Sequence, residues 1–206
     1  MRIRAKICGI TRTKDAMAAV LNGADAVGFV FHESSPRNIT VESARAISRS
    51  LPPFVARVGL FVDAEAGFVE QTLAVLSLDL LQFHGDETPE FCTGFGRPYI
   101  KSIAMRDRVD LRQQARRYST ATGLLVDTWS TDVKGGSGNI FDWSLLPRDT
   151  GKPLVLAGGL TVENVANAIR QVRPYAVDVS SGVESSKGIK DADKIAAFMK
   201  EVNQFS

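Results

Sequence analysis

Residues 13–31 read TKDAMAAVLNGADAVGFVF, a helix-like stretch followed by a strand-like one. The helix-like part ends at Gly23, and glycine favours the C-terminal end of a helix because it tolerates a positive φ angle. Residues 25–31 then form a short, nearly continuous apolar run, which is typical of a strand covered on both faces. A chain that repeats this unit is predicted to form an α/β fold.

Seven further apolar runs occur at a spacing of roughly 25 residues, the spacing of βα units, and amphipathic stretches separate them. The eight predicted strands are 3–8, 25–31, 54–62, 79–84, 99–103, 123–127, 153–157 and 175–179. The predicted helices are 13–22, 40–50, 65–76, 88–93, 107–118, 161–172 and 191–205. Only the gap after Asp127 lacks a long helix, and residues 141–143 suggest a short one there.

Apolar strands that alternate with helices indicate a parallel sheet covered on both faces. Eight such units predict a single (β/α)₈ TIM barrel, one domain that spans residues 1–206. A typical barrel has about 250 residues, so this one is predicted to be compact, with short loops. A doubly wound open sheet is the structural alternative, but it usually needs fewer strands.

The composition is that of an ordinary globular protein. Hydrophobic residues make up 44% and charged residues 23% of the 206 residues, which argues against a disordered chain or a disulfide scaffold. With 25 Lys and Arg against 23 Asp and Glu, the net charge is +2. This balance predicts neither nucleic acid nor a membrane surface as the main partner. A small anionic ligand needs only a local positive site and stays open.

The two cysteines, Cys8 and Cys92, cannot form a zinc site alone, and no His stands at ligand spacing from either. We therefore expect no metal and two free thiols. The first residues lack the apolar run of a signal peptide, and no run of about 18 apolar residues predicts a membrane span. A reducing, cytoplasmic location is the resulting expectation.

Polar residues follow the predicted strands at their C-terminal ends, where the chemistry of a (β/α)₈ barrel is located. Because these ends meet on one rim, the side chains are expected to converge on one site. The candidates are Lys6, Cys8, Arg37, His84, Asp127, Gly158, Gly159, Asp178, Ser180, Ser181 and Gly182.

Cys8 stands at the end of the first strand, beside Lys6 and before Gly9. One interpretation is a buried free thiol, since cysteine is among the most buried residue types. The other is a reactive thiol, because a nearby cation can lower its pKa and make it a base or a nucleophile. Cys92 lies in a helix-like stretch away from the rim and is predicted to serve packing.

Asp127 is either a cap or turn residue or a general acid held in a partly apolar barrel mouth. A base on the first strand and an acid on the sixth would leave room for a substrate between them. Arg37 is either a surface residue or a ligand contact that donates two parallel hydrogen bonds to a carboxylate or phosphate. His84 is likewise either a structural hydrogen-bonding residue or a ligand contact.

The glycine- and serine-rich ends of the seventh and eighth strands predict a phosphate site. In many barrels the loops after these two strands bind phosphate through backbone N–H groups, and glycine permits close approach. Each loop alone could be a simple strand-to-helix turn. Residues 135–138, GGSG, are either a mobile lid or an ordinary loop. The phosphate candidates are Gly136, Gly158, Gly159, Ser180, Ser181 and Gly182.

Nine motifs in order resemble one known family, and together they cover nearly the whole chain. They are KICGIT at 6–11, GAD at 23–25 with GFVF at 28–31, SPR at 35–37, VGLF at 58–61, LQFHG at 81–85, GGSG at 135–138, FDW at 141–143, LAGGL at 156–160 and VDVSSGVE at 177–184. The chain resembles the phosphoribosylanthranilate isomerases of tryptophan biosynthesis. It departs from them at 186–188, SKG, where the family usually has Pro before the Gly.

The resemblance implies an Amadori rearrangement of N-(5-phosphoribosyl)anthranilate to the 1-deoxyribulose 5-phosphate product, with no cofactor. It implies Cys8 as general base and Asp127 as general acid. Arg37 would hold the anthranilate carboxylate, with His84, Lys6 and Asp178 as further substrate contacts. The oligomeric state stays open between a monomer and a homodimer.

Three competing functions remain. An indole-glycerol-phosphate synthase relative would use a Lys acid, and a ribulose-phosphate epimerase type would use paired Asp residues with a metal. The third is a non-catalytic barrel that binds a phosphorylated ligand. The strand-1 Cys with the strand-6 Asp fits neither enzyme, and the presence of both residues weighs against the third.

Overall fold

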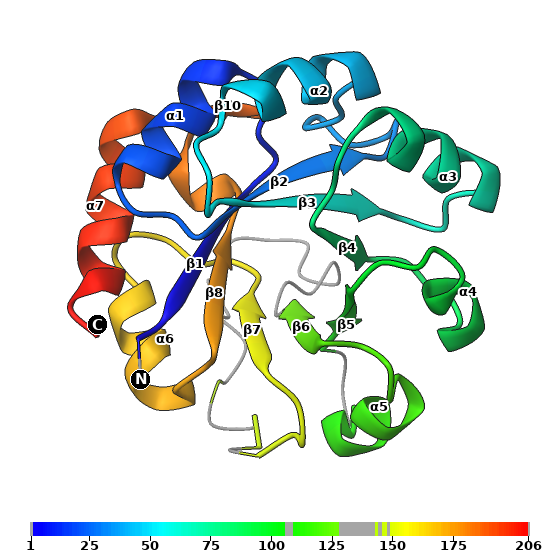
Figure 1. Ribbon diagram of the computed structural model, residues 1–206. Coiled ribbons are helices and arrows are strands. Elements are labelled where there is room, and N and C mark those ends of the chain that lie inside the picture. Colours follow the sequence, from blue (N-terminus) through cyan, green and yellow to red (C-terminus); the bar gives the residue numbers. More distant parts are fainter. Residues whose placement is uncertain (1, 106–108, 128–142, 144–145, 148, 206) are drawn as a thin grey trace.

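Eight parallel strands close into a barrel in the computed structural model, which describes residues 2–105, 109–127, 143, 146–147 and 149–205 (Figure 1). Each strand pairs with its neighbours in chain order, and β1 closes the ring against β8. This confirms the predicted (β/α)₈ TIM barrel and excludes the open sheet. The strands are β1 (Arg4–Cys8), β2 (Ala26–Phe31), β3 (Ala56–Phe61), β4 (Leu80–Phe83), β5 (Tyr99–Ala104), β6 (Gly123–Asp127), β7 (Leu154–Ala157) and β8 (Ala176–Val179).

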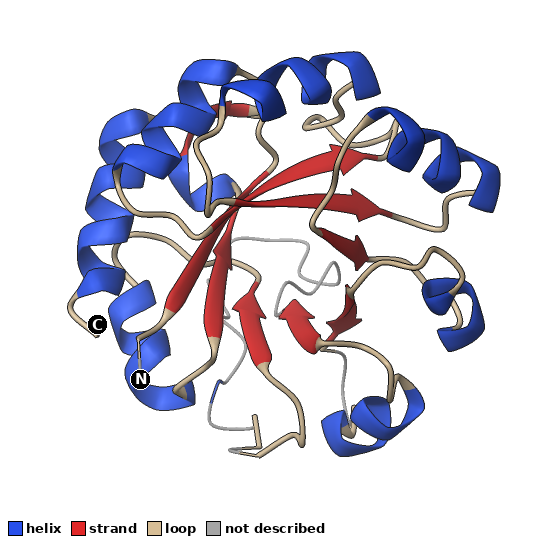
Figure 2. Cartoon of the chain, viewed as in Figure 1, coloured by secondary structure: helices blue, strands red, loops and turns tan. Residues whose placement is uncertain are grey.

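Helices surround the ring of strands on its outside (Figure 2). None of the helices in the described ranges has the length and apolar character needed to cross a membrane. The helices are α1 (Thr13–Leu21), α2 (Val41–Ser50), α3 (Ala66–Val75), α4 (Pro89–Thr93), α5 (Leu111–Arg117), α6 (Val165–Val172) and α7 (Ala192–Asn203).

Side-chain caps determine where several of these helices begin. Thr40 accepts a hydrogen bond from the backbone N–H of Ser43 at the start of α2. Asp191 accepts from the N–H groups of residues 193 and 194 at the start of α7. Such caps satisfy N–H groups that the first helical turn leaves without partners. At the other end of α1, Gly23 has φ 88, as its position after the helix predicts.

Two helices begin later than the sequence pattern predicts. Helix α5 begins after Asp110, whose side chain caps it, rather than at 107, although 107 and 108 lie outside the described residues. Helix α6 begins after Asn164 instead of at Thr161. The Asn164 side chain accepts from the N–H of Thr161 and donates to the carbonyl of Gly159, so it holds a turn there. Of the short helix expected at 141–143, only Trp143 is described.

A turn and a short hairpin follow β8, and the sequence analysis predicted neither. A short 3₁₀ turn, η2 (Ser181–Val183), leads into a two-stranded antiparallel hairpin of β9 (Glu184–Ser186) and β10 (Ile189–Lys190). Two- and three-residue strands carry almost no sequence periodicity, so the pattern gave no signal for them. The hairpin lies beside the chain that follows β2, because a Cβ at Gly188 would lie 2.6 Å from the carbonyl oxygen of Pro36.

Alternate residues of the strands belong to different clusters, as the two-residue period of a strand requires. In β1, Ala5 and Ile7 pack in the large core that includes helix residues. Cys8 instead packs with Val30 and Leu60 in a small separate cluster. The barrel therefore has an apolar outer layer beneath its helices and a small apolar floor that contains Cys8.

Phe83 is the centre of an aromatic cluster in the outer core. It is fully buried, and its ring centroid lies 5.7 Å from Phe91, 5.8 Å from Phe95 and 5.8 Å from Tyr99. We expect Phe83→Ala to lower the free energy of unfolding by about 3–5 kcal/mol, because it removes buried contacts and leaves a cavity. Urea unfolding measures this loss.

Phe54→Ala is the matched control, because Phe54 is fully exposed. Its unfolding midpoint should stay close to that of the unchanged protein. Equal midpoints for the Phe83 and Phe54 variants would contradict the packing argument.

Candidate active site

A cavity of about 610 Å³ opens at the C-terminal ends of the strands, and we refer to it as the central cavity. The structure brings most of the predicted site residues together around it. Of the others, Lys6 and Gly182 lie outside its described lining, and Gly136 lies outside the described residues. The predicted residues that line it are Cys8, Arg37, His84, Asp127, Gly158, Gly159, Asp178, Ser180 and Ser181.

Several lining residues were missed by the sequence analysis. The apolar part of the cavity wall is formed by Val30, Leu60 and Val62. In the sequence these residues cannot be distinguished from apolar residues of the core. His32 and Gln82 are polar and lie at or near strand ends, so the rule that identified His84 could have found them. Glu184 also lines the cavity, although the sequence analysis treated it only as part of a motif.

Cys8 lies on the floor of the cavity beside a buried pair of charges. Lys6 Nζ lies 2.9 Å from Asp178 Oδ1, and both side chains are buried. The distance is that of an ion pair, but the angles do not meet hydrogen-bond geometry. β1 and β8 place the pair, since Lys6 and Asp178 are direct register partners. Gly28 gives them room, because a Cβ there would lie 2.8 Å from Cys8 Sγ and 3.2 Å from Lys6 Nζ.

The Cys8 thiol is less acidic than its neighbours in sequence suggest. Burial raises the pKa of Cys8, Lys6 opposes that rise, and the negative charge of Asp178 adds to it. Lys6 therefore lowers the pKa of Cys8, as its neighbouring position suggests, but burial and Asp178 together outweigh that effect. Burial also opposes the charge on Lys6, but Asp178 and Cys8 outweigh it and raise the pKa of Lys6. The Lys6 ammonium therefore stays positively charged beside the Cys8 thiol.

A hydrogen-bonded chain links β4 to β6 across the cavity. The amide nitrogen of Gln82 donates to His84 Nδ1 over 3.0 Å, and His84 Nε2 lies 3.2 Å from Asp127 Oδ2. Since Nδ1 accepts, Nε2 carries the hydrogen and donates it to Asp127. Gln82 is fully buried, whereas the other two side chains are about a quarter exposed. The chain therefore holds the Asp127 carboxyl group at the edge of the cavity.

The ends of β7 and β8 meet on another side of the cavity. Gly158 and Gly159 both have positive φ, 79 and 66, so the chain turns there in a way that favours glycine. Gly182 packs so tightly that a Cβ would lie 1.9 Å from the Leu160 carbonyl oxygen. Ser180 donates its hydroxyl to the carbonyl of Cys8 over 3.1 Å. These contacts join the two loops to each other and to the end of β1.

Arg37 faces the cavity from the loop after β2. Its Nε and Nη2 each donate to a different carboxylate oxygen of Glu184, and both distances are 2.8 Å. Arg37 is therefore fixed by a two-bond ion pair while part of its side chain remains accessible.

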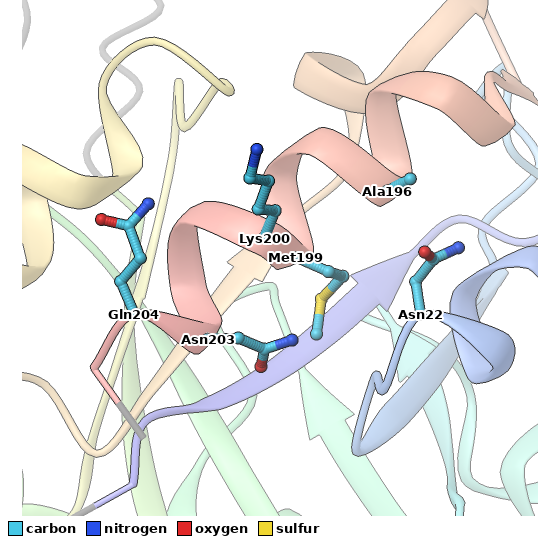
Figure 3. A pocket seen from close by; sticks show the side chains of 6 residues that line it. All are labelled: Asn22, Ala196, Met199, Lys200, Asn203 and Gln204. Carbon is cyan, nitrogen blue, oxygen red and sulfur yellow. The ribbon is translucent and has the colours of Figure 1, made fainter.

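Three other hollows contain neither Cys8 nor Asp127 nor the loops after β7 and β8. One lies along the outer face of α7 beside the end of α1, and its lining contains no acidic side chain (Figure 3). Lys200 is the only charged residue among the six that line it. Within the described ranges, no three His, Cys, Asp or Glu side chains are grouped to hold a metal ion. The central cavity is therefore the candidate active site.

Comparison with known proteins matches this site to one family. The family described as N-(5′-phosphoribosyl)anthranilate (PRA) isomerase matches residues 5–201. A relative from Pseudomonas syringae pv. tomato, N-(5′-phosphoribosyl)anthranilate isomerase, is 58% identical over 201 residues, 98% of each chain. The chain belongs to the N-(5′-phosphoribosyl)anthranilate isomerase family. It is therefore an enzyme, and the resemblance inferred from its sequence motifs is confirmed.

Solved structures of the family share the fold. The phosphoribosyl anthranilate isomerase of Thermotoga maritima is 45% identical and superposes with a TM-score of 0.90, covering 98% of this chain and 99% of that one. A second isomerase structure, 42% identical with a TM-score of 0.87, covers the same shares. That protein was solved in complex with reduced 1-(o-carboxyphenylamino)-1-deoxyribulose 5-phosphate.

The Lys6 charge should determine how readily Cys8 ionises. Replacing it in Lys6→Met removes the group that opposes the burial effect, so the pKa of the Cys8 thiol should rise further. The measurement is the ultraviolet absorbance of the thiolate as pH is raised, or the pH dependence of alkylation. Cys92→Ala is the background, because burial raises the Cys92 pKa to about 12 and its signal would otherwise overlap.

In that background, Lys6→Arg is the control that keeps the charge, and its thiol should titrate close to the unchanged protein. A Cys8 titration that does not move in Lys6→Met would show that the ammonium does not act on the thiol. Circular dichroism at each pH separates a true titration from unfolding.

Proposed function

We propose that this enzyme catalyses the Amadori rearrangement of N-(5-phosphoribosyl)anthranilate to 1-(2-carboxyphenylamino)-1-deoxyribulose 5-phosphate in tryptophan biosynthesis. The observation that carries this proposal is the arrangement of Cys8 and Asp127 around one cavity whose third side is formed by the β7 and β8 loops. Membership of the isomerase family supports the choice of substrate.

Asp127 acts first, as general acid. It protonates the furanose ring oxygen while the bond from that oxygen to C1 breaks, and the anthranilate nitrogen supplies electrons to give an iminium ion. Asp127 is left as a carboxylate. The Nε2–H of His84, which already lies 3.2 Å from Asp127, stabilises that anion. This assigns His84 an orienting role beside the acid.

Cys8 then acts as general base. Its thiolate removes the proton from C2 of the ribose, the electrons form the C1–C2 double bond, and the iminium is neutralised as an enolamine. The enolamine tautomerises to the ketone as the C2 hydroxyl loses a proton and C1 gains one. Proton exchange with solvent then returns Asp127 to its acid form and Cys8 to its thiolate. Lys6, which lies beneath the thiol, favours the thiolate electrostatically, and this role suits its position better than direct substrate contact. Asp178 lines the cavity and holds Lys6 in place.

The remaining lining residues bind the two anionic ends of the substrate. Backbone donors around Gly158, Gly159, Ser180, Ser181 and Gly182 bind the phosphate, because helix- and turn-like loops at these strand ends suit an anion. Arg37 binds the anthranilate carboxylate. Every step moves a proton or an electron pair within the substrate, so the proposal includes no cofactor and no metal.

Removal of either proton-transfer group tests the mechanism. Cys8→Ala and Asp127→Asn should each lower kcat by roughly 10²–10⁴-fold, the usual contribution of a positioned acid or base. The assay follows the loss of phosphoribosylanthranilate fluorescence without added metal. Cys92→Ala is the matched thiol control and should retain turnover, because Cys92 is fully buried away from the cavity.

Fluorescence loss no faster than the uncatalysed rate in the unchanged protein would overturn the proposed reaction. Near-normal turnover of either variant would instead remove only that residue from the mechanism.

Arg37 should affect binding more than chemistry. Arg37→Ala removes a charged ligand for the carboxylate and should raise KM by roughly tenfold or more, with a smaller change in kcat. Steady-state kinetics on phosphoribosylanthranilate measure both constants. An unchanged KM would contradict the proposed carboxylate contact.

A further inference from the structure

A buried polar network lies behind Arg37 and joins the β2 loop to the β9–β10 hairpin. Its centre is Glu184, the first residue of β9, whose side chain is 5% exposed. Glu184 Oε1 accepts from Arg37 Nε and from Lys190 Nζ, each over 2.8 Å, and Oε2 accepts from Arg37 Nη2 over 2.8 Å. The mechanism above uses neither Glu184 nor Lys190.

The network fixes the guanidinium plane. The two bonds to Glu184 use two of the five N–H groups of Arg37, and the hydrogen bonds of the described residues leave both N–H groups of Nη1 available. The stem of Arg37 is also confined, since a Cβ at Gly9 would lie 2.6 Å from Arg37 Cδ. The remaining edge of the guanidinium therefore has a defined direction.

The net charge of the network depends on its third member, Lys190. Arg37 and Glu184 alone would form a neutral pair, and a neutral pair would attract a substrate carboxylate only weakly. Lys190 adds one positive charge, so the three residues together carry one net positive charge at the cavity wall. Lys190 is buried and cannot itself reach a ligand in solvent, and its other hydrogen bonds go to the carbonyl and hydroxyl oxygens of Ser180.

The ionisation of Glu184 agrees with this geometry. Burial would raise the pKa of Glu184, but hydrogen bonds from Arg37 and Lys190 outweigh it and lower the pKa. The Glu184 carboxylate therefore stays charged. Burial lowers the pKa of Lys190 from its ordinary value, and Glu184 opposes that change.

We propose that Glu184 and Lys190 are positioning residues that make Arg37 selective for a carboxylate on the aromatic end of the substrate. Glu184 fixes the guanidinium, and Lys190 offsets the charge of Glu184 so that the positive charge of Arg37 remains effective. This inference rests on the proposed role of Arg37 in carboxylate binding.

The test measures equilibrium binding of two probes separately, anthranilate by its fluorescence and inorganic phosphate by calorimetry. Lys190→Met should raise the Kd for anthranilate by roughly tenfold or more, because the group of Arg37, Glu184 and residue 190 then carries no net charge. The Kd for phosphate should change less, because, of the residues proposed to bind phosphate, only Ser180 contacts Lys190. Lys190→Arg, which keeps the charge, should largely restore anthranilate binding. Glu184→Asp keeps the charge but shortens the reach, so it should also raise the anthranilate Kd.

A double-mutant cycle separates positioning from general structural damage. In an Arg37→Ala background, Lys190→Met should have little further effect on anthranilate binding, because Lys190 acts through Arg37. The inference is overturned if Lys190→Met weakens both probes equally, leaves both unchanged, or has its full effect without Arg37. If Lys190→Met does not fold, the Glu184→Asp and Lys190→Arg variants decide, since a normal anthranilate Kd in Glu184→Asp would overturn the inference.

This design distinguishes the inference from the proposed function. If anthranilate binding does not depend on Arg37, the carboxylate contact itself fails. If it depends on Arg37 but not on Lys190 or Glu184, the contact stands and only the positioning role fails.

Discussion

Closure of the sheet is the constraint on which the rest of the structure depends. Strand β1 pairs with β8 across more than 160 residues of sequence, and the register aligns Lys6 with Asp178 and Ile7 with Val179. A shift of one residue would turn every side chain of β1 to the other face. Cys8 would then leave the cavity floor for the outer core, and Lys6 would lose its partner. One register therefore determines both the packing and the site.

Closure of the barrel also means that charged side chains in the site must be paired. Inward-facing positions of a narrow barrel are nearly dry, so any charge there must have a compensating charge. Lys6 and Asp178 meet this condition inside the barrel. Glu184 meets it in the hairpin after β8, where Arg37 and Lys190 surround it. The first group acts on a thiol and the second on a guanidinium. Each leaves one reactive or binding atom facing the cavity.

The parts of the molecule that sequence could predict are those fixed by local patterns. Apolar runs identified the eight strands, and their last residues identified Cys8 and Asp127, because strand ends in a barrel share one rim. Glycine after α1 and threonine before α2 marked helix ends for stereochemical reasons that apply to any chain. These inferences needed no knowledge of which strand lies beside which.

The parts that could not be predicted depend on contacts between distant residues. Arg37 and Glu184 are 147 residues apart, and the hairpin that joins them has strands too short to leave a pattern. The late start of α6 follows from two hydrogen bonds of the Asn164 side chain. The ionisation of Cys8 stayed open because sequence shows its cationic neighbour but neither the depth of its burial nor the proximity of Asp178.

A second buried lysine shows how the same residue type can serve a different purpose. Lys101 Nζ donates to the carbonyl oxygens of Phe83, Gly85 and Ser102 and lies 3.2 Å from Glu87 Oε2. Its donors are satisfied by the backbone, so its charge and hydrogen bonds serve to hold the end of β4. Lys6 Nζ has a carboxylate partner too, Asp178 Oδ1 at 2.9 Å, but it lies beside the Cys8 thiol. The same residue type therefore holds a strand end in one place and supplies a positive charge beside the Cys8 thiol in the other.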